Sequence, residues 1–246
     1  MCGKIIKTYK SQTLDFRGLD ITTLPYLPKD IKYLYAPRML TELPPLPQTL
    51  KFLDCSWTNL KALPYLPRNL EELYLPHSSI SSLPPLPPSL KILNFANTKF
   101  SGPLILPQRL EILDCRYTKI TSFNIPESLK QLYCSRTNIT RLPNLNYGLT
   151  HLDCWAVNIK KLTNLPVTLL SLNIYSPYLY SLPRLPEGLV NLECVAAKFT
   201  RLPKLPKSLK TLNCSFSNIT QLPDLPEGLE ILKTTNTNLK TTDTNL

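Results

Sequence analysis

The chain has 246 residues, of which 43% are hydrophobic, with 25 prolines, only 6 glycines and a formal net charge of +11. That apolar content excludes a disordered chain, and the positive charge requires that an acidic partner be considered. No stretch approaches the roughly twenty apolar residues of a membrane helix. The first twelve residues, MCGKIIKTYKSQ, lack the apolar run of a secretory signal, so we expect a cytoplasmic protein.

A repeat of about twenty residues organises the chain. Leucine occupies one phase of the repeat twelve times, at Leu14, Leu34, Leu53, Leu73, Leu93, Leu113, Leu132, Leu152, Leu172, Leu192, Leu212 and Leu232. Two residues later the chain places six of its seven cysteines, at Cys55, Cys115, Cys134, Cys154, Cys194 and Cys214. A second motif, Leu-Pro-x-Leu-Pro, separates these segments, as in LPYLPRNL at 63–70.

Each Leu-x-Cys segment predicts a short strand, because alternation turns Leu53 and Cys55 to one side and Asp54 to the other. Stacked units would pair these strands in parallel and share one core. The Leu-Pro-x-Leu-Pro half is incompatible with a helix, since proline removes a donor and clashes with the preceding turn, so an extended, polyproline II-like return is expected. The motif is displaced at 101–107 and shortened at 122–126. We expect the backbone of these two segments to bend differently from that of the neighbouring units.

The cysteine column is interpreted as core. Cysteine packs as a small hydrophobe, and Leu75, Phe95 and Ile174 replace it in other units. A column of thiols favours a reducing compartment. There is no C-x-x-C motif, and an in-register ladder does not supply tetrahedral ligands, so no metal or other cofactor is predicted.

The strand residues that point away from the core predict a concave binding face. His151, Asp153 and Trp155 alternate on one strand, and Tyr133 and Tyr175 flank them on the adjacent units. Tyrosine, tryptophan and arginine are the side chains that anchor protein interfaces. We therefore predict a protein-binding surface with an exposed Trp155 at its centre, and the same columns add Asp114 and Arg116. The alternative is a set of solvated strand residues that contribute only solubility.

The basic residues fall mostly outside this face. They occupy turns, the return segment or the positions just after a strand, at Lys51, Lys91, Lys130, Lys210, Arg68, Arg109, Lys204, Lys207, Lys99, Lys119 and Lys198. A nucleic acid or another acidic surface would therefore meet a basic rim rather than the face. The alternative is a solvated rim, and no nucleic-acid-binding motif is present.

Catalysis finds little support in the sequence. The only histidines are His77 and His151, and alternation turns His151 away from the neighbouring cysteines. No phosphate-binding loop or metal-ligand spacing occurs. We therefore expect no enzyme activity.

The unit L-x-x-L-x-C-x-x-T-x-I-x-x-L-P-x-L-P-x-x resembles the leucine-rich repeat from residue 13 to residue 239. Its proline-containing half is similar to the short repeats of bacterial type III secreted effectors, of the outer-protein-M and invasion-plasmid-antigen-H types, and of predicted giant DNA virus proteins. The usual ladder asparagine is mostly threonine or serine here, at Thr58, Ser78, Thr98, Thr118, Thr137 and Ser217. We expect these hydroxyls to bond the turn backbone.

The resemblance implies a curved solenoid of about twelve short parallel strands that binds a protein partner, in the host cytoplasm if the chain is viral or an effector. We expect a cap at 1–12, the solenoid at 13–239 and a tail at 240–246. An under-capped end would allow end-to-end self-association. The effector ligases carry a separate catalytic domain, so ligase activity is not carried over; recognition of substrates for a separate ubiquitin ligase is a further alternative.

Overall fold

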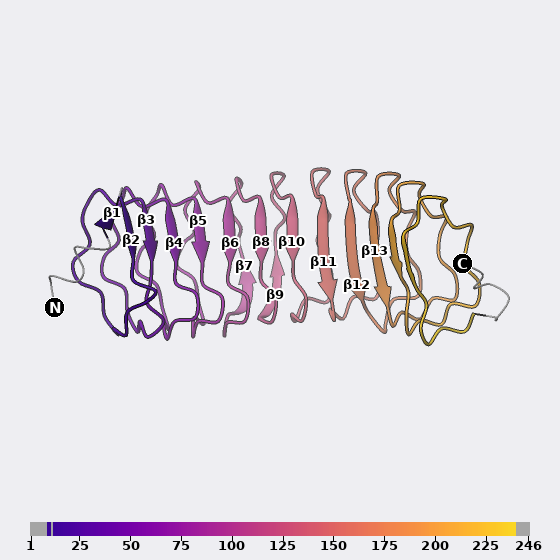
Figure 1. The fold of residues 1–246 in the computed structure, drawn as a ribbon, viewed down its shortest axis with the longest axis horizontal. Helices are drawn as coiled ribbons and strands as arrows, with labels where there is room; N and C mark the ends of the chain where they lie inside the picture. The colour runs from indigo at the N-terminus through magenta and orange to yellow at the C-terminus, as the bar shows by residue number, and fades with distance from the viewer. Residues whose placement is uncertain (1–8, 11, 240–246) are drawn as a thin grey trace. The chain divides into compact units, whose positions relative to one another are not determined.

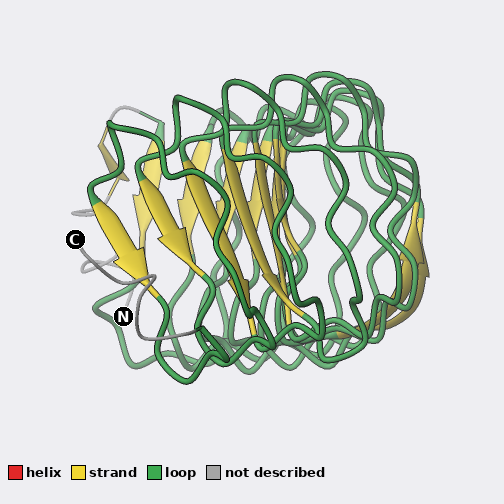
Figure 2. Ribbon diagram, turned by 90° about the vertical axis from the view of Figure 1, so that its right-hand side faces the viewer, coloured by secondary structure: helices red, strands yellow, loops and turns green. Residues whose placement is uncertain are grey.

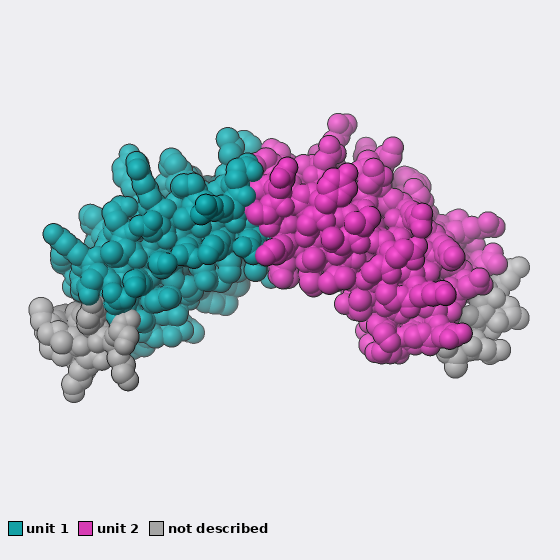
Figure 3. Space-filling model, turned by 90° about the horizontal axis from the view of Figure 1, so that it is seen from above, with its two compact units in different colours: residues 1–120 teal, residues 121–246 magenta. Residues whose placement is uncertain are grey.

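The structure is a computed structural model that describes residues 9–10 and 12–239. Within these ranges the chain forms strands, turns and extended segments, with no helix and hence no helix able to cross a membrane (Figure 2). Two compact units are present, residues 1–120 and 121–246 (Figure 3). The predicted tail lies outside the described residues. So does the predicted cap, except for residues 9, 10 and 12. The assignment of 13–239 to one domain stays a prediction.

The first unit is built on a sheet whose strands pair in chain order (Figure 1). The strands are β1 (Tyr9–Lys10), β2 (Thr13–Asp15), β3 (Tyr33–Tyr35), β4 (Phe52–Asp54), β5 (Glu72–Tyr74), β6 (Ile92–Asn94) and β8 (Ile112–Asp114). From β2 onward the pairing is parallel, with repeat leucine opposite repeat leucine, as in Leu34 opposite Leu53. The two-residue strand β1 runs antiparallel to β2 and pairs with its edge.

The second unit repeats this arrangement. Its strands are β10 (Gln131–Tyr133), β11 (His151–Trp155), β12 (Ser171–Tyr175), β13 (Asn191–Val195), β14 (Thr211–Asn213) and β15 (Ile231–Lys233). They pair in parallel and in chain order, again with the leucines in register. Each of the twelve strands predicted around a repeat leucine is therefore confirmed.

The interior of each unit contains the two predicted columns. The repeat leucines from Leu14 to Leu212 are at most 3% exposed, whereas Leu232 in the last strand is only partly buried. The six repeat cysteines are free thiols with no exposed surface. The core interpretation of the cysteine column is confirmed, because their side chains occupy the same buried positions as Leu75, Phe95 and Ile174.

A tight turn follows most strands and depends on the ladder hydroxyl. The Oγ1–H of Thr58, Thr98, Thr118 and Thr137 and the Oγ–H of Ser217 donate to the carbonyl oxygen three residues earlier, at 2.5–2.8 Å. The predicted hydroxyl-to-backbone bond is thus confirmed at five positions. Ser78 differs, because its buried Oγ has no hydrogen-bond partner.

The residue before this hydroxyl position takes a left-handed conformation without being glycine. Trp57, His77, Tyr117 and Phe216 have φ between 56° and 60°, and Ala156 and Ala196 have φ of 55° and 50°. For residues with a Cβ this conformation is strained. The neighbouring turns hold it in place: the Trp57 N–H donates to Pro76 O at 2.8 Å, and the Ala156 N–H donates to Tyr175 O at 3.0 Å.

The return segments are extended, as predicted, and end in a turn where a leucine N–H donates to a proline carbonyl three residues earlier, as from Leu70 to Pro67 at 3.1 Å. The irregular stretches form strands instead. They are β7 (Ser101–Leu104) and β9 (Lys119–Phe123), which begins in the first unit and crosses the boundary. At 122–126 a single proline remains, which leaves more backbone N–H groups free for pairing, and next to β7 the Lys119 N–H donates to Phe100 O at 2.9 Å.

Candidate functional site

The outward face of the second unit is centred on strand β11. Leu152 and Cys154 are buried, while His151, Asp153 and Trp155 alternate with them and remain partly exposed. Tyr133 on β10 lies opposite Asp153, and Tyr175 on β12 lies opposite Trp155. The structure therefore brings together the five residues predicted to form the centre of the face, and we refer to them as the Trp155 cluster.

The Trp155 indole packs between two neighbours. Its ring centroid lies 5.0 Å from that of Tyr175, with an interplanar angle of 43°. On the adjoining turn, the Arg136 guanidinium carbon lies 4.5 Å from the Trp155 ring centroid, a cation–π arrangement. Trp155, which was predicted to be exposed, is partly exposed between these neighbours.

The polar members of the cluster are fixed by short hydrogen bonds. The buried hydroxyl of Ser135 donates to Asp153 Oδ1, and its oxygen accepts from the backbone N–H of Trp155 at 2.8 Å. Tyr133 OH donates to Gln131 Oε1 at 3.0 Å. His151 Nδ1 lies 2.9 Å from Thr150 Oγ1. The cluster is thus an ordered surface, with rings and polar groups already in position.

The remaining predicted site residues, Asp114 and Arg116, lie in the first unit. They occupy the columns of Asp153 and Trp155 but bond to each other: Arg116 Nε and Nη2 donate to the two Asp114 carboxylate oxygens at 2.9 and 2.7 Å. Asp114 is buried. Their charges therefore largely offset each other within the first unit.

The first unit carries a second aromatic cluster, which the sequence interpretation missed. The Phe52 ring lies 4.8 Å from Tyr35, 5.4 Å from Tyr74 and 6.2 Å from Tyr33. Burial and the neighbouring Glu72 raise the pKa of Tyr74 to about 12, and Tyr74 OH donates to Glu72 Oε2 at 3.1 Å. The available signal was the column just before each repeat leucine, where Tyr33 and Phe52 follow one another.

A stacked pair at the strained turns was also missed. The rings of Trp57 and His77 lie 3.6 Å apart and almost parallel, at 7°. Asn97 Nδ2 lies 2.6 Å from His77 Nδ1. Trp57 is 57% exposed, so the stacked pair presents an aromatic ring to solvent at the end of the strands of the first unit.

The predicted basic rim is partly neutralised. Glu71 accepts from Lys51 at 2.9 Å and from Lys91 at 2.7 Å, and Glu230 pairs with Lys210 at 2.9 Å. These pairs leave less positive potential on the rim than the sequence predicts. They are exposed, so each contributes little to stability.

The buried thiols of the cysteine column are held in their neutral form. Burial raises the pKa of the thiols of Cys55, Cys115, Cys154 and Cys194 far above the ordinary value of 9.0, and that of Cys214 to about 11. A neutral buried thiol is neither a nucleophile nor a metal ligand. Across residues 12–239 the structure contains no group of three histidine, cysteine or carboxylate side chains able to hold a metal ion.

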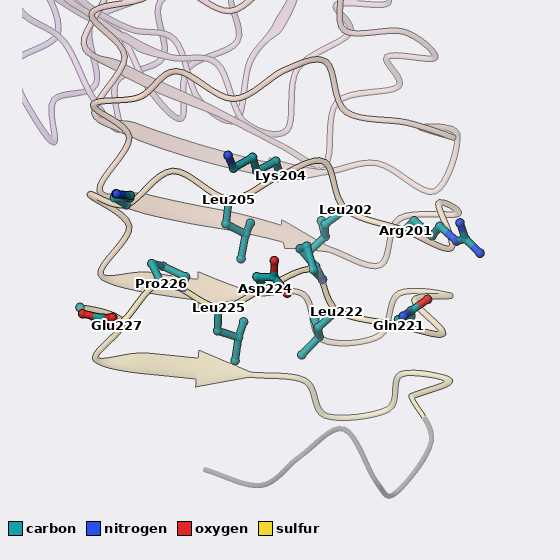
Figure 4. Close-up of a pocket in the computed structure, with 13 residues that line it drawn as sticks. Arg201, Leu202, Lys204, Leu205, Gln221, Leu222, Asp224, Leu225, Pro226 and Glu227 are labelled. Atoms are coloured by element: carbon teal, nitrogen blue, oxygen red, sulfur yellow. The ribbon is translucent and has the colours of Figure 1, made fainter.

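Two cavities of about 790 Å³ each lie in the second unit, between neighbouring return segments. In the first, Leu202, Leu205, Leu222 and Leu225 extend from two adjacent segments, with charged groups around them (Figure 4). The second lies between 140–145 and 158–164. Its wall includes Arg141, Lys160, Lys161 and Tyr178.

Comparison with solved structures shows the leucine-rich-repeat fold. YopM from Yersinia enterocolitica is 27% identical with a TM-score of 0.64, over 89% of this chain, and the chain spans only 58% of its length. YopM from Yersinia pestis, a leucine-rich effector protein, is 27% identical with a TM-score of 0.63, over 93% of this chain and 84% of its own. A leucine-rich-repeat protein of Leptospira interrogans is 22% identical with a TM-score of 0.62, over 97% and 82%. No family model and no curated protein sequence matches the chain.

Proposed function

We propose that this chain, a leucine-rich-repeat solenoid similar to the repeats of bacterial effectors, binds a protein partner through the Trp155 cluster. Its fold is that of a protein-interaction module in general. The observation that carries the proposal is the packing of Trp155 between Tyr175 and Arg136. Large aromatic and arginine side chains with a part-buried, pre-ordered geometry are typical of the residues that dominate binding energy at protein interfaces.

The polar groups of the cluster supply directional contacts around these rings. Asp153 is oriented by Ser135, and Tyr133 by Gln131, so a partner does not have to immobilise mobile side chains when it binds. Such pre-organisation raises affinity by lowering the entropic cost of association. The proposed function is non-enzymatic, and the partner would be met in the cytoplasm.

The test is affinity capture from a host or parent-cell lysate with nuclease present, using Tyr133→Ala, Trp155→Ala and Tyr175→Ala together. A protein partner lost with this triple variant supports the proposal. The matched control replaces three exposed tyrosines that lie outside the strands with alanine, at Tyr26, Tyr65 and Tyr147, which are 81–89% exposed. Equal loss in the control, or a partner retained by the triple variant, would contradict the proposal.

A further inference from the structure

The edge of the second unit that follows the strands is basic and contains no carboxylate. Four successive turns contribute residues 138–145, 156–165, 176–183 and 196–203, and none of these stretches contains aspartate or glutamate. Exposed side chains of Arg141, Lys160, Lys161, Tyr178, Tyr180 and Lys198 occupy them. We refer to these six residues as the basic edge.

Acidic groups of the same unit gather elsewhere. Glu127, Glu187 and Glu227 lie in the turns that precede the strands, at the opposite edge. Between residues 12 and 239, the structure contains no ion pair made by any of the four cations of the basic edge. Their charge is therefore available to an anionic ligand.

The basic edge is a spatial cluster and not only a pattern in the sequence. Arg141, Lys160, Lys161 and Tyr178 line the same cavity of about 790 Å³. One turn farther, Lys198 Nζ lies 5.8 Å from the centre of the Tyr180 ring, and the Lys198 N–H donates to Leu179 O at 3.1 Å. Two turns that carry cations are thus followed by a turn that carries both rings and by a turn that carries Lys198.

Both tyrosines are large apolar rings exposed to solvent, at 44% for Tyr178 and 65% for Tyr180. A surface that only keeps a protein soluble has no need for such rings among its cations. A chain of phosphates would pair with the cations, and planar groups attached to that chain would stack on the rings. This combination is the chemistry of single-stranded nucleic acid, whose bases are free to stack on aromatic side chains.

We infer that the basic edge binds single-stranded nucleic acid without sequence specificity, through phosphate contacts from Arg141, Lys160, Lys161 and Lys198 and base stacking on Tyr178 and Tyr180. This surface is separate in the sequence from the Trp155 cluster, and the inference does not depend on the protein-binding proposal. It also moves the predicted nucleic-acid contacts away from the lysines that pair with Glu71 and Glu230.

The test is fluorescence anisotropy of the full chain with labelled oligo-dT and oligo-U of about 12 nucleotides, within the site sizes common for such proteins. Four phosphate contacts predict a slope near −2.8 for the logarithm of the binding constant against the logarithm of the salt concentration. Binding should therefore weaken roughly 50-fold from about 50 to 200 mM salt. Tyr178→Ala with Tyr180→Ala should weaken binding by roughly tenfold or more. Preference for oligo-U or for oligo-dT would each support the inference and assign RNA or DNA.

The charge test uses a matched pair of variants. A triple variant, Arg141→Gln with Lys160→Gln and Lys161→Gln, should bind with a salt dependence whose slope is less steep by about 2. The control, Arg184→Gln, Lys204→Gln and Lys207→Gln, removes the same charge from two return segments and from the turn before β14. If direct contact and not net charge determines affinity, this control should bind within about threefold of wild type. All six side chains are exposed, and circular dichroism verifies folding.

Three results would overturn the inference. The first is equal loss in the two charge variants, which would indicate attraction by net charge alone. The second is full binding by the tyrosine variant together with equal binding of heparin, a polyanion that has no bases. The third is binding to phosphatidylserine vesicles without binding to either oligonucleotide, which would make the edge a membrane surface.

Discussion

Ser135 and Asp153, in adjacent repeats of the second unit, are joined by a hydrogen bond from the serine hydroxyl to the carboxylate. The same hydroxyl oxygen accepts from the backbone N–H of Trp155 at 2.8 Å. One buried side chain thereby connects both functional columns of the outward face. This relationship orients the Asp153 carboxylate and fixes the backbone at Trp155, whose ring packs against Tyr175 and Arg136.

Removing that hydroxyl should loosen the face. Ser135→Ala leaves the Asp153 carboxylate and the Trp155 N–H without this partner, so we expect a loss of about 1–2 kcal/mol in the free energy of unfolding, measured by urea denaturation. Ser181→Ala is the control, because Ser181 is exposed and should change stability by less than about 0.5 kcal/mol. Equal effects of the two substitutions would contradict the account.

The cysteine column predicts sensitivity to alkali. Burial raises the thiol pKa values of Cys55, Cys115, Cys154, Cys194 and Cys214 above the ordinary 9.0, so the folded state retains protons that the unfolded state loses. The stabilisation is complete below pH 9.0 and declines as pH rises through the folded-state values. Each thiol should reduce the free energy of unfolding by about 1.4 kcal/mol per pH unit above 9.

Urea denaturation at pH 8 and pH 10 measures this decline in the free energy of unfolding. In Cys154→Ala the decline should be smaller than in wild type by the contribution of one thiol. Cys154→Ala also costs stability at pH 8, because it removes a buried sulfur, but that cost is independent of pH. A free energy of unfolding that stays constant between the two pH values would show that the thiols are not shielded as the structure indicates.

Two buried serines at the same turn position should respond differently to alanine. Ser217 Oγ–H donates to Cys214 O at 2.5 Å, whereas Ser78 Oγ has no partner. We expect Ser217→Ala to cost about 1 kcal/mol and Ser78→Ala to be neutral or stabilising, because it removes a buried polar group that makes no bond. Thermal or urea unfolding of the two variants provides the comparison, and the reverse order would contradict the assigned bonds.

The strained turns offer a stabilising substitution. Ala156 and Ala196 have φ of 55° and 50°, where a Cβ costs roughly 1–2 kcal/mol. Ala156→Gly and Ala196→Gly should therefore each raise the free energy of unfolding. The net gain is up to about 1 kcal/mol, because glycine also increases the conformational entropy of the unfolded chain, which offsets part of the relieved strain. Ala62 is exposed and has an ordinary φ, so Ala62→Gly should instead destabilise the protein; the same sign for all three would exclude strain as the cause.

Periodicity was sufficient to predict the strands and the core. A leucine in one phase of every unit, with Cys115 or Phe95 two residues later, requires one buried side of a strand and determines the register. Alternation then placed Asp153 and Trp155 on the opposite side. These inferences succeeded because strand geometry relates sequence separation directly to side-chain direction.

The remaining features depend on turns, where alternation stops. Arg136 reaches Trp155 from a left-handed turn, and nothing in its sequence position signals that conformation, since such turns usually carry glycine. The stack of Trp57 on His77 arises in the same way. At 101–104 a strand forms in the return segment, and the period does not signal it.

The most direct test of the proposed function maps the contact itself by photo-crosslinking. p-Benzoylphenylalanine is introduced in place of Tyr175, within the Trp155 cluster, or in place of Tyr147, an exposed tyrosine in the turn that precedes β11. After irradiation with the captured partner, the account predicts a covalent product from position 175 and none from position 147. A product from position 147 alone would move the binding surface away from the sheet and contradict the central claim.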